Sequence, residues 1–594
     1  MLNKSRYPLF IVFVILVAIT LFACESNEQT NEPIEKQKIE INNVKMNDEP
    51  LGSVEITGAL YATPTGVFNP IFIQDAYEES ILSFTHEQLV TQNESLEFIP
   101  QLAKKWEVNE DYTELTVYLE EGIKWHDGEK FTAHDVLFTY QVIADPDYIE
   151  AGGLRTAFVQ PLLGYNEYVQ GNVEEFTGIQ VINDYTIKFV YKEPTVNPLF
   201  YISAPIIPEH IFKDIPVADI PNAPESTQPD KVIGTGPFIF THLEEGDRYV
   251  LKRFDNYWQG QPFIDTVVWQ VVAPPVLPGL MESGEIDFIA DPIGIQPPEV
   301  NKFSNLTKIT LIEQSDFNYQ LLGYKHNHLT PDDIDAGIIN PNNWVANDKL
   351  STEIREAISY AIDRNKLIDE VYDGHGTVLH APIPIQSWAY NEELSTNYNY
   401  NPEKAKSILD ELGYIDTEDD DKFREDANGN EWVLNFNYPT GNEIREKTAE
   451  HIQVMLNEIG INVNMRKSDT FAQYIKDLSN NSNDWDLYLM EWDIPTIDPD
   501  PSYIWQTESP YNFSRWHSPE SEELLNKALS TPDAFDEGYR QKVYKEWQQI
   551  FSTDLPALIL FSPNTIWAYN ERIQGVNPLP TTMFHDVHLW QVKD

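Results

Sequence analysis

The sequence predicts an α/β protein built from two or three domains. Its 594 residues exceed a single hydrophobic core, because one domain usually holds about 100–200 residues. Hydrophobic residues make up 41% and charged residues 23% of the chain, a balance typical of globular proteins. A helical pattern over residues 443–459 stops at Gly460, and alternating apolar residues follow at 461–465. This alternation of helix and strand favours an α/β arrangement.

Local patterns predict the first elements in chain order. Apolar and polar residues alternate from Val54 onward and again over residues 115–119, and each stretch predicts a strand. The segment 126–128 (His-Asp-Gly) predicts a turn, since glycine supplies the backbone angle that such turns need. Thr132 and Asp135, three positions apart, resemble a capping box and predict the start of a helix.

Further helices are predicted in the second half of the chain. Residues 353–371 place small and branched apolar side chains on one face and predict one helix. Asn401 and Pro402 form a cap and a first turn, and Gly413 marks the end of that helix. Together with the helix over 443–459, these elements predict an α/β region in this half.

Charge and cysteine content exclude several classes of protein. The chain has 95 acidic residues against 40 Lys and Arg, a formal charge of −55, which excludes a protein that neutralises nucleic-acid phosphates. A single cysteine excludes a disulfide framework and a multi-thiolate metal site. The acidity indicates either a salty or alkaline exterior or simply a solvated surface. The many aromatic residues predict a large core, with a ligand cleft as the alternative.

The N-terminus has the features of an export signal. Lys4 and Arg6 precede an apolar run over residues 9–22 that is shorter than a membrane-spanning helix. The run ends in Leu-Phe-Ala-Cys, which resembles the lipobox of bacterial lipoproteins. The resemblance implies cleavage before Cys24 and attachment of a lipid to its thiol, which would anchor the protein to the extracytoplasmic face of the cell membrane. The alternative is an ordinary signal peptide with a chance cysteine.

A set of motifs in a fixed order resembles the extracellular solute-binding proteins of family 5, the peptide and nickel type that serves ABC importers. Any one motif is weak evidence, but the ordered set is specific and runs from about residue 54 to beyond 560. The closest likeness is to oligopeptide-binding lipoproteins of the App type. The motifs are Ile99–Ala103 with Trp106, Gly122–Gly128, Phe131–Val136, Gly234–Phe238, Ser283–Asp287, Arg355–Arg364, Asn401-Pro402 with Gly413-Tyr414, and Ile459–Ile461.

The resemblance implies a two-lobed periplasmic-binding-protein fold of class II type, with an enlarged first lobe and a cleft that closes by a hinge. In this fold a ligand is held between the lobes, and closure signals occupancy to the membrane partner. The implied parts are a signal peptide (1–23), a flexible tether (24–50), lobe I (51–320, with an extra subdomain near 70–230, completed by 555–594) and lobe II (321–554).

The segment 491–501 resembles the family's ligand-bordering motif, a tryptophan followed by Asp-Pro-Asp. In peptide-binding relatives a carboxylate three residues after the tryptophan holds the peptide's ammonium group, but here that position is Pro495. Asp493 or Asp498 are the candidate substitutes, and Trp492 is a candidate cleft residue. Core packing for Trp492, and turn formation for Asp498 and Asp500, are the alternatives.

Tyr61, Asn69, Tyr77 and Tyr324 are further candidate ligand contacts, because they lie in segments that approach the cleft in relatives. For each of them, packing in the core or at the surface is the alternative. No catalytic residue, metal site or cofactor is predicted.

Two sequence features suggest metal binding at first sight. The pairs His126-Asp127 and His134-Asp135 could ligate a metal, but turn and capping roles are the favoured interpretation. The acidic segment 416–429 superficially resembles a calcium loop, yet it lacks the glycine and glutamate spacing of an EF-hand and is interpreted as a solvated hairpin.

The favoured function is a monomeric receptor that captures oligopeptides and delivers them to the permease subunits of an ABC importer. Alternatives are the same role for an oligosaccharide or a chelated metal, or a secreted hydrolase. The hydrolase is disfavoured because the sequence contains no His-Glu-x-x-His and no Gly-x-Ser-x-Gly motif.

Overall fold

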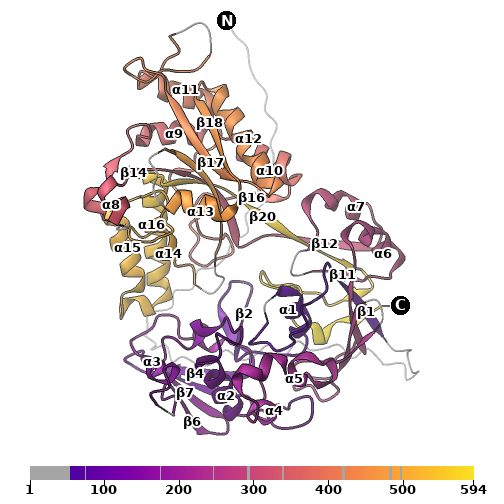
Figure 1. Ribbon diagram of the computed structural model, residues 1–594. Helices are drawn as coiled ribbons and strands as arrows, with labels where there is room; N and C mark the ends of the chain where they lie inside the picture. The colour runs from indigo at the N-terminus through magenta and orange to yellow at the C-terminus, as the bar shows by residue number, and fades with distance from the viewer. Residues whose placement is uncertain are drawn as a thin grey trace, which may run out of the picture. The chain divides into compact units, whose positions relative to one another are not determined.

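Figure 1 shows the computed structural model of the chain. It describes residues 54–593 except 74, 174, 245–246, 291–293, 337–339, 418–421, 480–483 and 495–497. The predicted signal peptide, the tether and Cys24 therefore lie outside the described residues. Residues 53–594 form one compact unit.

A large mixed sheet organises this unit. Its hydrogen-bonded order is β18-β17-β19-β13-β20-β11-β1-β10-β9-β8, and β12 and β16 pair with β20 beside this path. Parallel pairing joins β1 to β10 and β11, and β17 to β18 and β19. The strands are β1 (Glu55–Leu60), β8 (Phe238–Glu244), β9 (Arg248–Arg253), β10 (Thr266–Val271), β11 (Phe288–Ile289), β12 (Ile309–Ser315), β13 (Asn318–Tyr324), β16 (Gly376–Val378), β17 (Val433–Pro439), β18 (Asn462–Ser468), β19 (Leu487–Asp493) and β20 (Ala557–Asn570).

The 14-residue strand β20 lies in the middle of this sheet and pairs with strands of both halves. Its first residues pair with β13, where Ala557 lies opposite Gly323. Its last residues pair with β12 and β11, where Asn570 lies opposite Ile309. The chain therefore crosses between the two halves of the sheet twice, once from β12 to β13 and once along β20.

A second, antiparallel sheet of four strands lies in the region predicted as the subdomain. Its order is β4-β5-β7-β6, and β5 alternates buried and half-buried residues as the sequence predicts. The strands of this region are β2 (Val90–Gln92), β3 (Phe98–Pro100), β4 (Ala103–Val108), β5 (Glu114–Leu119), β6 (Ile179–Asn183) and β7 (Thr186–Val190). Its own hydrophobic cluster runs from Ile71 to Ile220.

Helices cover the sheets, and Figure 1 shows α9 to α12 grouped around β17 and β18. The remaining short strands are β14 (Asn327–His328), β15 (Val345–Ala346), β21 (Ile573–Gln574) and β22 (Gln591–Val592). The helices are α1 (Ala76–Leu82), α2 (Ala133–Ala144), α3 (Tyr165–Val169), α4 (Glu209–Phe212), α5 (Pro224–Thr227), α6 (Leu277–Ser283), α7 (Val300–Ser304), α8 (Pro331–Ala336), α9 (Thr352–Ala361), α10 (Arg364–Tyr372), α11 (Pro402–Glu411), α12 (Glu443–Glu458), α13 (Phe471–Ser479), α14 (Ser502–Trp505), α15 (Pro519–Leu529) and α16 (Glu537–Asp554), with the 3₁₀ turns η2 (Phe200–Ile202) and η8 (Asp533–Phe535) among the connections.

The hydrophobic clusters fall into two groups that correspond to the two halves of the large sheet. Two clusters draw only on residues between 319 and 561. Two others combine residues 56–303 with residues 566–590 near the C-terminus. The C-terminal segment thus packs with the first part of the chain. The lobe boundaries themselves, at 320 and 555, stay a prediction.

The single helix predicted over 353–371 is two helices, and this prediction was wrong in that respect. α9 ends at Ala361, Ile362 and Asp363 have extended backbone, and α10 begins at Arg364. The Asp363 carboxylate accepts a hydrogen bond from the backbone N–H of Lys366 and caps α10. A cap residue inside an apolar helical pattern is the signal that marks such a break.

The other local predictions are confirmed. Thr132 and Asp135 form a capping box at the start of α2. Asn401 caps α11, which begins at Pro402. The backbone of Gly413 has a φ of 84°, in the left-handed region that favours glycine after a helix.

The segment 126–128 is a turn, and His126 supports a neighbouring loop rather than a metal. The backbone N–H of Gly234 donates to its Nδ1 (3.1 Å), and its Nε2 lies 3.0 Å from the carbonyl oxygen of Gly236. Burial lowers the pKa of His126 to about 4, which keeps the ring neutral with its proton on Nε2. Both ring nitrogens therefore form hydrogen bonds with the Gly-Thr-Gly-Pro loop, residues 234–237.

That loop needs its glycines because it lies directly against the backbone at Thr85. A Cβ on Gly234 would lie 1.8 Å from the Thr85 carbonyl oxygen, and one on Gly236 would lie 2.8 Å from the carbonyl oxygen of Phe84. The close approach allows the N–H of Gly236 to donate to the Thr85 carbonyl (2.9 Å). The motif therefore has a structural role at this contact.

Candidate functional site

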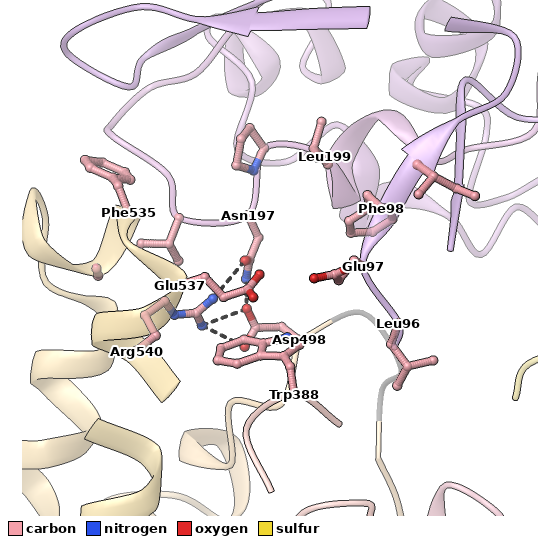
Figure 2. Close-up of a pocket in the computed structure, with 14 residues that line it drawn as sticks. Leu96, Glu97, Phe98, Asn197, Leu199, Trp388, Asp498, Phe535, Glu537 and Arg540 are labelled. Atoms are coloured by element: carbon pink, nitrogen blue, oxygen red, sulfur yellow. Dashed lines mark hydrogen bonds and ion pairs between the residues drawn. The ribbon is translucent and has the colours of Figure 1, made fainter. Parts of the chain in front are cut away.

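A cavity of about 400 Å³ lies where the region of β2, β3 and η2 meets α16 and η8, and Figure 2 shows its lining. Its walls combine residues from the four-stranded-sheet region with residues from the second half of the chain. The lining residues are Leu96, Glu97, Phe98, Ile99, Val196, Asn197, Pro198, Leu199, Trp388, Asp498, Ala534, Phe535, Glu537 and Arg540.

Asp498 is held by the Asp-Pro-Asp segment in which the sequence places it. The backbone N–H of Asp500 donates to the Asp498 carboxylate (2.9 Å), and the Asp500 carboxylate in turn accepts from the N–H of Ser502 (3.1 Å), next to the start of α14. Turn formation was the alternative to ligand contact that the sequence analysis gave for both aspartates. The two turns fix the direction in which the Asp498 carboxylate points.

Arg540 on α16 binds this carboxylate. Its Nη2 lies 2.7 and 2.8 Å from the two Asp498 oxygens, and its side chain is only 6% exposed. Nη2 also donates to the Tyr544 hydroxyl (2.9 Å), and Nε donates to the carbonyl of Ala528 (3.0 Å). Burial alone would lower the pKa of Arg540, but the Asp498 charge and the hydrogen bonds to Asp498 and Tyr544 outweigh it and raise the pKa. The guanidinium therefore stays charged beside its carboxylate.

Asn197 completes this group from the other side of the cavity. Its amide Nδ2 donates to Asp498, and its Oδ1 accepts from Arg540 Nη1 (3.2 Å). One amide thus satisfies both members of the ion pair, as the dashed lines in Figure 2 show. A second contact lies nearby, where the rings of Tyr112 and Phe535 stack with an interplanar angle of 2°. These contacts join the first part of the chain to the second.

Sequence reasoning missed Asn197 and Arg540. Arg540 carries a readable signal, because it stands on the same helix face as Val543, Tyr544 and Trp547, which are buried. A cation in an apolar stripe needs a buried anion. Asn197 carries no comparable signal, since its partners lie more than 300 residues away in the sequence.

Trp492 and Asp493 lie at the end of β19, opposite Tyr319 and Asn318 of β13. The half-buried indole stacks on Phe513 at 6.1 Å between ring centroids, and its Nε1 has no hydrogen-bond partner among the described residues. Asp493 is exposed. Pro495, the position of the relatives' ammonium-binding carboxylate, lies outside the described residues.

Like Trp492 and Asp493, the four remaining candidates do not line the cavity. Asn69 is buried, and its amide donates to Ser226 (3.1 Å) and accepts from the backbone N–H of Ile71 (3.3 Å). Tyr61 donates to the carbonyl of Gly294. Tyr77, on α1, is half-buried, and burial followed by the nearby Asp75 charge raises its pKa.

Tyr324 needs a correction as a cleft residue. Its side chain is fully buried in the core of the second half of the chain, on β13. Its hydroxyl lies 2.7 Å from the Ser359 hydroxyl. With no exposed surface, Tyr324 packs the core, which is the alternative that the sequence analysis left open.

Within the described ranges, no three His, Cys, Asp or Glu side chains gather as a potential metal site. Of the acidic segment 416–429, residues 418–421 lie outside the described part. The rest forms a turn in which the Asp426 carboxylate accepts from the backbone N–H groups of Asn428 (2.8 Å) and Asn430 (2.9 Å). In the part of the chain that the structure covers, no helix is both long and apolar enough to cross a membrane.

Residues 97–514 match the family model described as bacterial extracellular solute-binding proteins, family 5 middle. This chain belongs to that family. The prediction of the family is therefore confirmed. The family consists of binding proteins rather than enzymes, while the absence of enzymatic activity in this chain stays a prediction.

The family member is similar to curated relatives over nearly its whole length. It is 26% identical to the oligopeptide-binding protein AppA of Bacillus subtilis, over 99% of both chains. It is 26% identical to the dipeptide-binding protein of Escherichia coli, over 89% of this chain and 93% of the other. Among solved structures, Bacillus subtilis AppA in complex with a nonapeptide matches with a TM-score of 0.60 at 24% identity, over 92% of this chain and 100% of that one. The two-lobed α/β fold is confirmed.

Proposed function

We propose that this solute-binding protein captures oligopeptides outside the cytoplasm and delivers them to the permease of an ABC importer. The similarity to an oligopeptide-binding protein over 99% of both chains is the observation that carries the proposal. The position of the cavity supports it. Phe98 and Leu199 of its lining pack against the core of the four-stranded-sheet region, and Trp388 packs against a core of the second half of the chain.

A ligand in this position would favour one arrangement of the two halves of the chain that form the cavity walls. These halves are connected by the β12–β13 junction and by β20, which are few and extended connections. A peptide that touches both walls binds best to the arrangement in which both are in contact, and so shifts the population toward it. The Asn197 amide, which contacts both Asp498 and Arg540, would stabilise that arrangement further.

We assign recognition of the peptide's ammonium group to Asp493 rather than Asp498. Both Asp498 oxygens already accept hydrogen bonds from Arg540, and one also accepts from Asn197. Asp493 is exposed, and burial followed by the Asp493 charge raises the pKa of nearby Asp316. The negative potential beside Asp493 favours a cation there.

Mass spectrometry of the purified protein tests the proposal. We expect intact peptides of mixed sequence to be released on denaturation, and a nonapeptide library to bind stoichiometrically in calorimetry without turnover. Binding should vary little with most side chains, since an extended peptide can be held through its backbone. A single sugar or a metal complex in the cleft would refute the peptide assignment, and cleaved peptides would refute the receptor role.

The lipid anchor is part of the proposal. Substituting Cys24→Ser removes the only thiol of the chain, and two acyl chains are what stable anchoring requires. We expect the variant to move from the membrane fraction to the medium. A Ser26→Ala variant serves as the control and should remain with the membrane. Retention of the Cys24→Ser protein on the membrane would contradict the anchor.

A further inference from the structure

The cavity lining has two acidic residues besides the ion pair of Asp498 and Arg540, and both are exposed. Asp498 and Arg540 neutralise each other, and the other charged residues in its lining are Glu97 and Glu537. Among the described residues, no Lys, Arg or His forms an ion pair with either glutamate. The two carboxylates come from opposite walls, one from the turn that leads into β3 and one from the start of α16.

Local structure holds the Glu97 side chain in place and fixes the backbone position of Glu537. The Glu97 carboxylate accepts a hydrogen bond from the Asn93 amide (2.8 Å), and its backbone N–H donates to the Asn93 side chain (3.0 Å). Glu537 is the first residue of α16, directly after Asp536, which caps that helix. Burial and then the charge of Glu97 raise the pKa of Glu537, against the opposing effect of Arg540. The two carboxylates therefore repel each other.

The rest of the lining is largely apolar. Phe98, Trp388, Leu199 and Phe535 are half-buried and stand around the carboxylates in Figure 2. Aromatic and aliphatic walls suit the hydrocarbon stem of a long side chain, while carboxylates suit its charged end. At about 400 Å³, the cavity is large enough for such a side chain.

We propose that this cavity receives a lysine or arginine side chain of a bound peptide, with the cationic group between Glu97 and Glu537. The proposal rests on the proposed function and adds a ligand preference to it. A cation there would relieve the repulsion between the two carboxylates and form charge-assisted hydrogen bonds. The overall charge of −55 further favours the approach of cationic peptides.

The test compares one nonapeptide series in which lysine, norleucine or glutamine occupies each position in turn. For one position we expect lysine to bind about ten- to a hundredfold more tightly than norleucine, since tenfold corresponds to 1.4 kcal/mol. The double variant Glu97→Gln and Glu537→Gln should lose most of this preference and keep its affinity for the norleucine peptides. Glu94→Gln, an exposed change in the same turn, should keep the preference.

The outcomes separate this inference from the proposed function. If peptides bind but no position favours lysine, or if the double variant keeps the preference, the cationic pocket is refuted and the peptide receptor stands. If no peptide binds, both fail. Thermal unfolding of each variant checks that the folded protein is compared throughout.

Discussion

Replacing Asp498 with alanine is expected to lower the free energy of unfolding by about 3–5 kcal/mol. The Arg540 side chain is 6% exposed and would lose its only carboxylate partner among the described residues. Leaving a buried cation without a partner lowers the free energy of unfolding by far more than the intact ion pair raises it. Asn197 would also lose its acceptor. Chemical unfolding followed by tryptophan fluorescence measures the change.

The size of the effect distinguishes a buried ion pair from an exposed one. The control is Glu403→Ala, which removes an exposed partner of Lys406 and should cost less than about 1 kcal/mol. The double variant Asp498→Leu and Arg540→Met removes both charges and should recover at least half of the loss. A loss in Asp498→Ala no larger than in the control would contradict the account of the site.

Replacing Arg572 with alanine is expected to destabilise the protein by a similar amount, about 3–5 kcal/mol. Arg572 binds Asp287 through Nε and Nη2, both at 2.6 Å, and the Asp287 side chain is 2% exposed. The same carboxylate accepts from the backbone N–H of Thr57 on β1 (2.8 Å). Loss of Arg572 would leave a buried anion between β1 and the C-terminal segment. The midpoint of thermal unfolding reports the change.

Lys105→Ala is a matched control for this prediction. Lys105 and Glu107 also lie 2.6 Å apart, but both side chains are 57% exposed. The distance is the same, but this pair is exposed and joined by a single contact, so the control should change stability by less than about 1 kcal/mol. Equal effects of the two substitutions would contradict the prediction that the buried Asp287 carboxylate depends on Arg572.

The parts of this structure that could be predicted from sequence are those fixed by neighbouring residues. The capping box of Thr132 and Asp135 and the helix start at Asn401 depend on residues three positions apart. The break between α9 and α10 also depends on neighbouring residues, but the apolar pattern continues across it, so the cap at Asp363 was overlooked. At this point the capping residue, and not the apolar periodicity, determines where the helix ends.

The candidate site could be predicted only in part, because its residues meet through tertiary structure. The sequence pointed to Asp498, but not to Arg540 and Asn197, whose contacts with it span 42 and 301 residues. Glu97 and Glu537 are two of many acids in an acidic chain, and nothing in their surroundings singles them out. The burial of Tyr324 likewise follows from the position of β13 inside the sheet, between β19 and β20.

The course of β20 has a consequence for how the protein is made. Until residues 557–570 have been synthesised, both β11 and β13 lack a hydrogen-bonded neighbour on one side. Such open edges are sites of aggregation, and contacts this distant in sequence form slowly. A newly made chain therefore stays incomplete until its last forty or so residues emerge. Under the proposed function the polypeptide crosses a membrane before it folds, and this delay suits that route.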